Sequence, residues 1–299
     1  MKRVMLFLVT NIAVMLVLSL VYQVVLMAIG PEALAEFSRN GINLGVLAVW
    51  ALVFGMGGAL ISLLMSKPMA KWATHATVID GSEGPSERWL VETVRQLSER
   101  AGVKMPEVAI YPGEANAFAT GAFKNSALVA VSTKIMEQMS REELKAVLGH
   151  EMSHVANGDM VTLTLVQGVL NACVLFLARV IGYVAEGAIS GDRGRRRGTG
   201  AIYWLVYYLM QFLLGIGAAL VVNAFSRRRE YAADRGSAEL LVSPAPMIAA
   251  LRRLGNLQPG VLPDSLKAMG ISGKHASLFA THPSLEDRIA ALEKLQLGL

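Results

Sequence analysis

Residues 140–158 read SREELKAVLGHEMSHVANG and carry the local signals of one helix with both of its ends marked. Ser140 and Glu143 form a capping box, in which each side chain satisfies a backbone N–H at the start of a helix. Asn157 and Gly158 are residues that typically end a helix. The sequence therefore predicts a helix that begins at the capping box and stops at Gly158.

Two histidines on this helix have the spacing of metal ligands. His150 and His154 are four residues apart, about 40° around the helix axis and about 6 Å along it, so both imidazoles can reach one ion. Glu151 points about 100° away from His150 and lies beside the ion. A carboxylate there can take a proton from an attacking water and pass it to a leaving amine. The pattern indicates a metal-dependent peptidase; the alternative is a pair of structural histidines.

A catalytic zinc needs a third protein ligand and one open position. The metzincin spacing requires glycine at position 157 and histidine or aspartate at position 160, but Asn157 and Met160 stand there. A glutamate-ligand zinc peptidase remains, and the best third ligand is Glu230. Asp234, one helical turn later, can accept the outer ring N–H of His150. The alternative is a surface Glu/Asp pair that balances neighbouring arginines.

The composition of the whole chain indicates an integral membrane protein. Of 299 residues, 54% are apolar and 17% are charged, and the mean hydropathy is +0.46. Four stretches lack any charged side chain, and each can cross a hydrocarbon core of about 30 Å as a helix. They are residues 4–29, 40–66, 160–178 and 198–226. A cleaved signal peptide is the alternative for the first stretch, which is much longer than the apolar part of such a peptide.

Basic residues near the ends of apolar stretches favour the cytoplasmic side of a membrane. Lys2 and Arg3 precede the first stretch, and Lys67 and Lys71 follow the second. Both ends of the first hairpin are therefore expected in the cytoplasm, together with the segment that begins near Lys67.

The second hairpin is less regular, because its turn, residues 191–198, contains four arginines. Two full crossings would place these arginines outside, against the usual tendency. Full crossing is our interpretation, with a shallow or protein-buried hairpin as the alternative. His154 precedes this hairpin and Glu230 follows it, so an ion held by both requires an even number of crossings between them.

The remaining segments have a mixed composition and enough residues for one compact domain. We expect a membrane hairpin at 1–66, the first part of a protease domain at 67–157, a second hairpin at 158–226 and the rest of the domain at 227–299. Apolar periodicity predicts further helices at 86–100, 229–241, 247–254 and 285–295, and a small antiparallel sheet at 108–111, 116–120 and 127–131. The expected fold class is an integral membrane protein, mainly α with a small α+β domain.

Simple counts exclude a protein stabilised by intrachain disulfides and disfavour a nucleic-acid-binding protein. Cys173 is the single cysteine, so no intrachain disulfide can form. The net charge of +5 comes from arginines that flank apolar stretches, without a basic patch interleaved with aromatic residues. Nucleic acid is therefore not an expected partner.

Several motifs together resemble the HtpX family of membrane metalloproteases, which is related to the type I CAAX prenyl proteases. The matching segments are HEMSHVANGD at 150–159, the pair Glu230 and Asp234, NAFATG at 116–121 and THP at 281–283, together with the two hairpins. The resemblance implies a multi-pass zinc endopeptidase of the bacterial inner membrane, with its site facing the cytoplasm. It implies polypeptide substrates, chiefly damaged or misassembled membrane proteins, contact with membrane lipid, and work alongside other quality-control proteases.

The resemblance also implies roles for individual residues. His150, His154 and Glu230 would bind one zinc ion, Glu151 would be the general base, and Asp234 would support a ligand. His282 matches a histidine that steadies the oxyanion; the alternative is a residue that only begins a helix. In the family, a strand at the edge of the sheet binds the substrate backbone as an added strand. The matching residues here are Asn116, Ala117, Phe118, Ala119 and Thr120; the alternative is an ordinary sheet strand.

Two other functions remain open. CAAX-type processing is the weaker one, because four spans are too few for the large intramembrane chamber of the eukaryotic relatives. The other is an inert membrane chaperone or scaffold that keeps a structural zinc. Structural zinc sites close all four positions, usually with cysteines, and Cys173 lies inside an apolar stretch. Glu151 also argues for catalysis.

Overall fold

The structure is a computed structural model that describes residues 27, 43–123, 125–194, 200–257 and 280–296. The chain divides into two compact units. One comprises Met1–Ile61 and Thr164–Val221, and the other comprises Ser62–Leu163 and Val222–Leu299. We call them the helical unit and the sheet unit.

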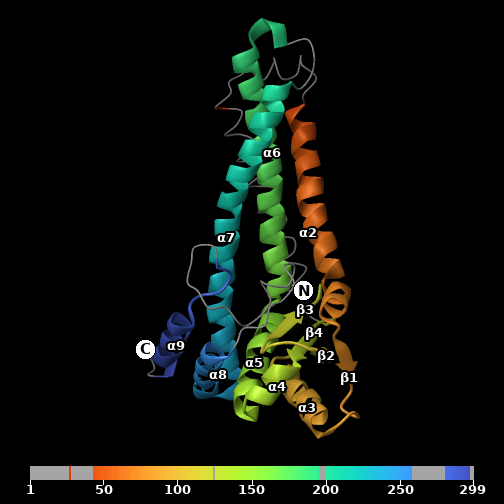
Figure 1. Cartoon of the computed structure of the whole chain (residues 1–299), viewed down its shortest axis with the longest axis vertical. Coiled ribbons are helices and arrows are strands. Elements are labelled where there is room, and N and C mark those ends of the chain that lie inside the picture. The colour runs from red at the N-terminus through yellow and green to blue at the C-terminus, as the bar shows by residue number, and fades with distance from the viewer. Residues whose placement is uncertain (1–26, 28–42, 124, 195–199, 258–279, 297–299) are drawn as a thin grey trace. The chain divides into compact units, whose positions relative to one another are not determined.

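Three helices in the described residues are long and apolar enough to cross a membrane. They are α2 (Leu44–Thr74), α6 (Asp159–Gly194) and α7 (Ala201–Leu241), all visible in Figure 1. They contain nearly all of the second, third and fourth predicted spans. The first predicted span, residues 4–29, lies outside the described residues apart from Met27, so a count of four spans is not confirmed.

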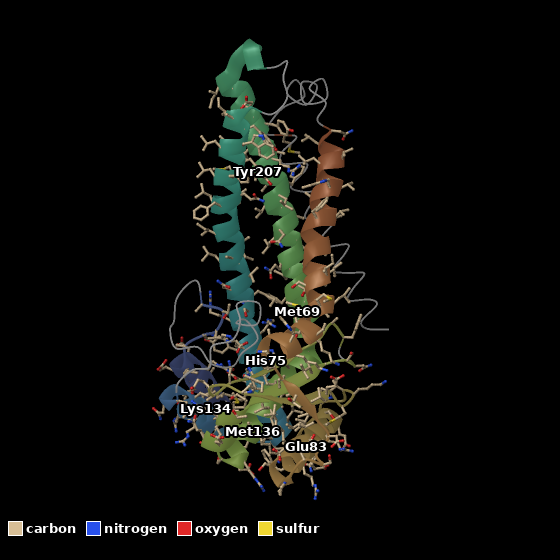
Figure 2. All side chains as sticks on the ribbon, turned by 45° about the vertical axis from the view of Figure 1, so that its right-hand side comes forward. Met69, His75, Glu83, Lys134, Met136 and Tyr207 are labelled. Carbon is tan, nitrogen blue, oxygen red and sulfur yellow. The ribbon has the colours of Figure 1, made fainter. Side chains whose placement is uncertain are left out.

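The helical unit exposes large apolar side chains, as a surface in contact with lipid requires. Phe54, Leu205 and Phe212 are each more than half exposed. One charged side chain packs against an aromatic ring: the Arg179 guanidinium lies 3.8 Å from the ring centroid of Trp50. Tyr207, which Figure 2 labels, packs in the same cluster, 5.7 Å from Arg179.

In its described residues, the sheet unit contains four strands in the order β1-β2-β4-β3. They are β1 (Thr77–Ile79), β2 (Glu107–Tyr111), β3 (Ala117–Thr120) and β4 (Leu128–Ser132). The prediction of an antiparallel sheet was wrong, because β2 and β4 run parallel, with Val108 opposite Val129. The sheet is mixed, since the β1–β2 and β3–β4 pairs are antiparallel.

The physical reason lies in the order of the strands. β3 and β4 form a hairpin after Gly121, whose φ of 141° suits only glycine. β4 then inserts between β2 and β3, so it runs in the same direction as β2. Alternation of apolar residues does not encode this choice. β1 was also missed, because it is only three residues long and two of them are exposed.

The part of the sheet unit that the structure describes also contains five shorter helices: α3 (Pro85–Arg100), α4 (Thr133–Gln138), α5 (Arg141–Asn157), α8 (Ala245–Asn256) and α9 (Leu285–Gln296). The helices predicted at 86–100, 247–254 and 285–295 are confirmed as α3, α8 and α9. The helix predicted at 229–241 is the last part of α7, and α4 was not predicted.

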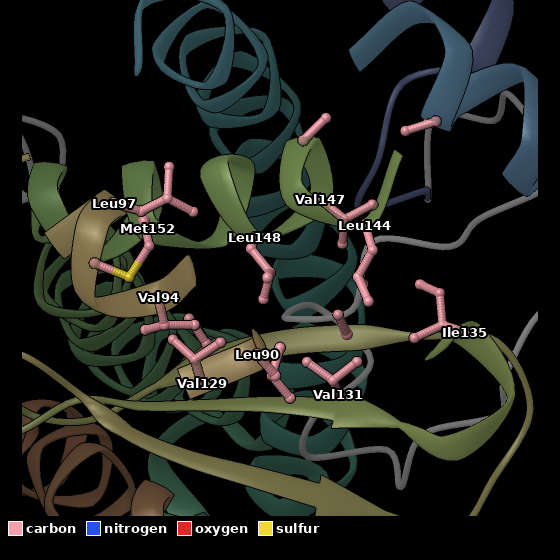
Figure 3. Packing of buried hydrophobic residues seen from close by; sticks show 14 of the residues in the cluster. Leu90, Val94, Leu97, Val129, Val131, Ile135, Leu144, Val147, Leu148 and Met152 are labelled. Carbon is pink, nitrogen blue, oxygen red and sulfur yellow. The ribbon is translucent and has the colours of Figure 1, made fainter. Parts of the chain in front are cut away.

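The core lies between the sheet and helices α3 and α5 (Figure 3). Val129 and Val131 of β4 face these helices and contact the cluster that contains Leu90 and Leu148. The alternate residues of β4 point to the other face, where Phe118 and the ring of Tyr111 pack, with centroids 5.5 Å apart. Both faces of the sheet are therefore buried.

Helix α5 begins and ends where its sequence predicts. The Ser140 Oγ accepts a hydrogen bond from the Glu143 N–H at 3.3 Å, and the Glu143 carboxylate accepts one from the Ser140 N–H at 2.8 Å. Gly158 closes the helix in the left-handed conformation, with φ 71°. The two ends fix which residues of α5 face the rest of the unit.

Candidate metal centre

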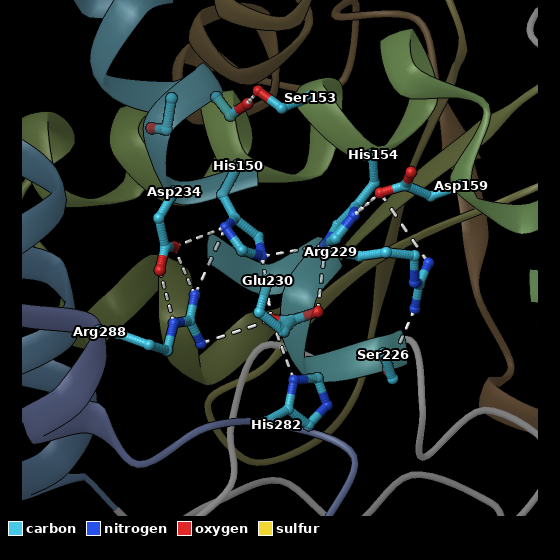
Figure 4. A network of polar contacts seen from close by, with 12 residues as sticks. His150, Ser153, His154, Asp159, Ser226, Arg229, Glu230, Asp234, His282 and Arg288 are labelled. Carbon is cyan, nitrogen blue, oxygen red and sulfur yellow. Dashed lines mark hydrogen bonds and ion pairs between the residues drawn. The ribbon is translucent and has the colours of Figure 1, made fainter. Parts of the chain in front are cut away.

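The three predicted metal ligands lie together in the sheet unit (Figure 4). One ligand atom from each of His150, His154 and Glu230 lies within 4.8 Å of the others, and all three residues are buried. The two Nε2 atoms are 3.1 Å apart. The Glu230 carboxylate lies 3.5 Å from Nε2 of His150 and 3.4 Å from Nε2 of His154. These atoms converge on one point, as ligands of a single ion do.

Each histidine has a carboxylate at its other ring nitrogen. Asp234 lies 2.9 Å from Nδ1 of His150, and Asp159 lies 2.6 Å from Nδ1 of His154. A hydrogen bond at Nδ1 leaves the Nε2 lone pair free for a cation and orients the ring. Asp234 was predicted from its spacing. Asp159 was not predicted as a partner; its signal is an acidic residue directly after the glycine that ends α5.

Small residues bring α5 and α7 close enough for this arrangement. The Ser237 Oγ of α7 donates to the Ala146 carbonyl of α5 at 2.7 Å. A Cβ added at Gly149 would meet the Ser237 Oγ at 2.9 Å. A Cβ added at Gly236 would meet the Oγ of Ser153 at 2.5 Å and its Cβ at 2.8 Å. The backbones of the two helices therefore approach more closely than larger residues permit.

Gly236→Ala should lower the free energy of unfolding by about 1–3 kcal/mol, because the added methyl overlaps Ser153 and forces α5 and α7 apart. Thermal unfolding of the purified protein in detergent measures this. Gly217→Ala is the matched control: it lies in the same helix, and no atom lies within 4 Å of the added Cβ. Equal effects of the two substitutions would contradict the close approach of the helices.

Glu151 is buried next to the histidines with its carboxylate unused. It is 1% exposed, and neither oxygen has a hydrogen-bond partner in the described part of the chain. Burial raises the pKa of Glu151, and the two histidines act against this shift without reversing it. The Ala119 N–H of β3 lies near this carboxylate without forming a hydrogen bond of good geometry, and it slightly favours the charged form. A carboxylate with free oxygens beside an ion site is suited to proton transfer.

His282 and Arg288 reach the centre from the last described segment (Figure 4). Nδ1 of His282 lies 3.0 Å from the Glu230 carboxylate. Arg288 is 1% exposed and donates to both oxygens of Asp234, at 2.8 and 2.6 Å. Arg288 was not predicted. Its signal is a charged residue within the apolar stripe of α9, one helical turn from both Leu285 and Leu292.

The electrostatics of the cluster suit a bound cation. Burial disfavours the charged form of His150 and His154, but their carboxylate partners outweigh it and raise the pKa of His150, and that of His154 to about 10. Burial alone would raise the pKa of Glu230, but His282, His150 and His154 hold it well below its ordinary value. The protonated imidazoles therefore balance the negative charge of the carboxylates, which a bound cation would also balance.

The buried charges also fit a divalent ion. Among the described residues, every buried Asp, Glu, Lys or Arg side chain lies at this centre: Glu151, Asp159, Arg229, Glu230, Asp234 and Arg288. With neutral histidines, four carboxylates face two guanidinium groups. The excess of two negative charges would be costly to bury unless a cation compensates it.

The predicted substrate strand lies beside Glu151. β3 pairs with β4 on one side, and in the described residues its other edge pairs with no strand. Phe118 is fully buried in the core cluster on the face away from α5. Asn116 is buried before the strand, where its Oδ1 accepts from the Ala117 N–H at 2.9 Å. All residues of β3 are buried, and the Thr120 hydroxyl has no hydrogen-bond partner among the described residues.

A helix that carries His150, Glu151 and His154, a distant glutamate beside them and long apolar helices define a membrane-bound metalloprotease. The chain belongs to peptidase family M48, whose sequence profile matches residues 85–296. The resemblance seen in the sequence motifs is thereby confirmed at the level of the family.

Full-length relatives support the same assignment. The chain is 54% identical over 293 residues to a "Protease HtpX homolog" of Verminephrobacter eiseniae (strain EF01-2), covering 98% of each chain. It is 53% identical over 302 residues to a "Protease HtpX homolog" of Bordetella pertussis (strain Tohama I), covering 100% of each. The crystal structure of S. mikatae Ste24p matches with a TM-score of 0.56 and 18% identity, over 95% of this chain and 65% of that one, which supports the fold alone.

Proposed function

We propose that the metal ion of this metalloprotease is zinc, one per chain, bound by His150, His154 and Glu230. The observation that carries the proposal is the convergence of two Nε2 atoms and a carboxylate in a buried cluster. Two imidazoles and one carboxylate, without a thiolate, form a donor set typical of catalytic zinc, which keeps one position open. The excess of buried negative charge and the unused oxygens of Glu151 support the same assignment.

The reaction is hydrolysis of an internal peptide bond. When bound, the ion supplies a Lewis acid that polarises the peptide carbonyl and makes a water molecule more acidic. Glu151 takes a proton from the attacking water and passes it to the leaving amine. His282, whose Nδ1 lies 3.0 Å from the Glu230 carboxylate and whose Nε2 has no hydrogen-bond partner among the described residues, donates to the oxyanion through Nε2. Asp234 orients the ring of His150.

The substrate is a polypeptide that binds in an extended conformation along β3. Within the predicted segment Asn116–Thr120, the edge of β3 that pairs with no strand among the described residues would provide backbone donors and acceptors for an added strand. Since the Phe118 side chain is buried in the core, the strand contacts a substrate through its backbone and imposes little sequence preference. This favours misfolded or damaged membrane proteins as substrates over one processing motif.

Metal analysis and digestion of casein test the proposal together. The purified protein should contain about one zinc per chain, and casein cleavage should stop with a chelator and return with added zinc. A folded, zinc-containing protein without proteolytic activity would favour a scaffold. Cleavage restricted to prenylated C-terminal motifs would favour CAAX-type processing.

We further propose that the protease site faces the cytoplasm of a bacterial inner membrane. The basic residues before the first and after the second apolar stretch support this orientation. Single cysteines at positions 38, 140 and 200, placed in a Cys173→Ala background, can be labelled with an impermeant thiol reagent on spheroplasts. Labelling at 38 and 200 but not at 140 is the expected result.

Other labelling patterns have definite meanings. Labelling at position 38 alone would indicate a shallow second hairpin that does not reach the outer surface. Labelling at position 140 would place the capping box of α5, and with it the protease site, outside the cytoplasm and overturn the orientation.

A further inference from the structure

Two buried arginines flank the candidate centre, but their guanidinium groups differ in how many of their N–H donors form hydrogen bonds (Figure 4). Arg288 donates to both oxygens of Asp234. Arg229 is 5% exposed, and its Nη2 donates to the Ser226 Oγ at 3.2 Å. Its Nε and Nη1 have no hydrogen-bond partner in the described part of the chain. A buried guanidinium with free donors requires a physical reason.

Among the ion pairs of the described residues, the anion that lies near these free donors is the carboxylate of Asp159. Nη1 of Arg229 lies 3.9 Å from the Asp159 Oδ2, the same oxygen that lies 2.6 Å from Nδ1 of His154. Asp159 is 7% exposed, so its charge is costly to leave without a positive partner. An imidazole that coordinates a metal is neutral and gives the carboxylate a hydrogen bond but no charge. The positive partner of Asp159 is then Arg229.

We propose that Arg229 is a positioning residue that acts on His154 through Asp159. The guanidinium keeps the carboxylate buried at Nδ1 of His154, and this hydrogen bond aims Nε2 at the ion. The inference rests on the proposed function, because it takes His154 as a metal ligand. The contacts of Arg229 are with Ser226 and Asp159, so in this role it acts through Asp159 rather than as a ligand.

The second ligand histidine has the same chain of contacts, which supports the inference. Arg288 holds Asp234, and Asp234 lies at Nδ1 of His150. In both cases the histidine contacts an aspartate, and that aspartate contacts an arginine. The contact of Arg229 with Asp159 is longer than that of Arg288 with Asp234, so its loss should weaken metal binding less than loss of the Arg288 contact.

Metal affinity of the full-length protein, measured by competition with a chromogenic zinc chelator, tests the proposal. Arg229→Gln should weaken zinc binding about 10-fold, as do other substitutions of residues that support a metal ligand without binding the metal. Arg228→Gln is the matched control: it removes the same charge from the neighbouring position of α7, where the side chain is exposed. Zinc affinity of the control should equal that of the unaltered protein.

A double-mutant cycle separates positioning from general structural damage. In an Asp159→Asn background, Arg229→Gln should have no further effect on zinc affinity, because the residue through which it acts has lost its charge. Arg229→Lys should recover part of the affinity, and saturating zinc should restore the kcat of Arg229→Gln. If Arg229→Gln does not fold, Arg229→Lys and Asp159→Asn and their combination provide the same cycle.

Unchanged or tighter zinc binding in Arg229→Gln would overturn the proposal, since tighter binding means that the guanidinium mainly repels the ion. Additive effects of the Arg229 and Asp159 substitutions would overturn it as well. Failure of the unaltered protein to bind zinc would instead refute the proposed function.

Discussion

Glu151→Gln should lower the kcat for peptide hydrolysis at least about 1000-fold while zinc content and fold stay unchanged. The amide has the same shape as the carboxylate but cannot accept the proton of the attacking water or return it to the leaving amine. Neither oxygen of Glu151 has a partner among the described residues, so the substitution breaks no contact that holds the centre together. Cleavage of a fluorogenic peptide and metal analysis of the same preparation measure both quantities.

Glu142→Gln is the matched control for this experiment. It makes the same exchange on the same helix, but Glu142 is exposed in the first turn of α5. Its kcat should be that of the unaltered protein. Substantial residual hydrolysis by a clean preparation of Glu151→Gln would remove Glu151 from its role as general base.

Glu230→Ala is expected to lose the metal itself. The substitution removes the only carboxylate that lies near Nε2 of both His150 and His154 in the described ion pairs. Loss of a ligand should weaken zinc binding by more than about 100-fold, which exceeds the effect of substituting a residue that only hydrogen-bonds a ligand. Peptidase activity should fall with the zinc content, and chelator competition measures the affinity directly.

Glu239→Ala, at an exposed position of the same helix, is the control for general effects of the exchange. It should retain both zinc and activity. Full zinc occupancy in Glu230→Ala would show that another residue is the third ligand.

The parts of the fold that were predicted correctly are those with local signals. The ends of α5 follow from a capping box at Ser140 and a glycine at position 158 that adopts a left-handed conformation. The apolar stretches identify α2, α6 and α7 by length and composition. The direction of β4 has no such signal, because either direction buries the same alternate residues on both faces of the sheet.

Around the candidate centre, residues related by helical spacing could be predicted, and residues brought in by tertiary contacts could not. His150 with His154 and Glu230 with Asp234 are each four positions apart, so one helical turn relates them. Arg288 reaches Asp234 from a different helix, α9. Its partner can be identified only when the packing of α7 and α9 is known.

The left-handed turn at Gly158 joins α5 to α6 without a linker. Asp159 is therefore the first residue of an apolar helix and also the acceptor for His154. At the other end of the hairpin, α7 continues without interruption from its apolar part to Glu230. No linker therefore separates the apolar helices α6 and α7 from the residues of the candidate centre, so the membrane anchor cannot be removed without removing residues that the centre needs. A water-soluble version of this enzyme would have to retain the ends of both anchor helices, so excision of the hairpin at its apolar limits would yield an impaired fragment.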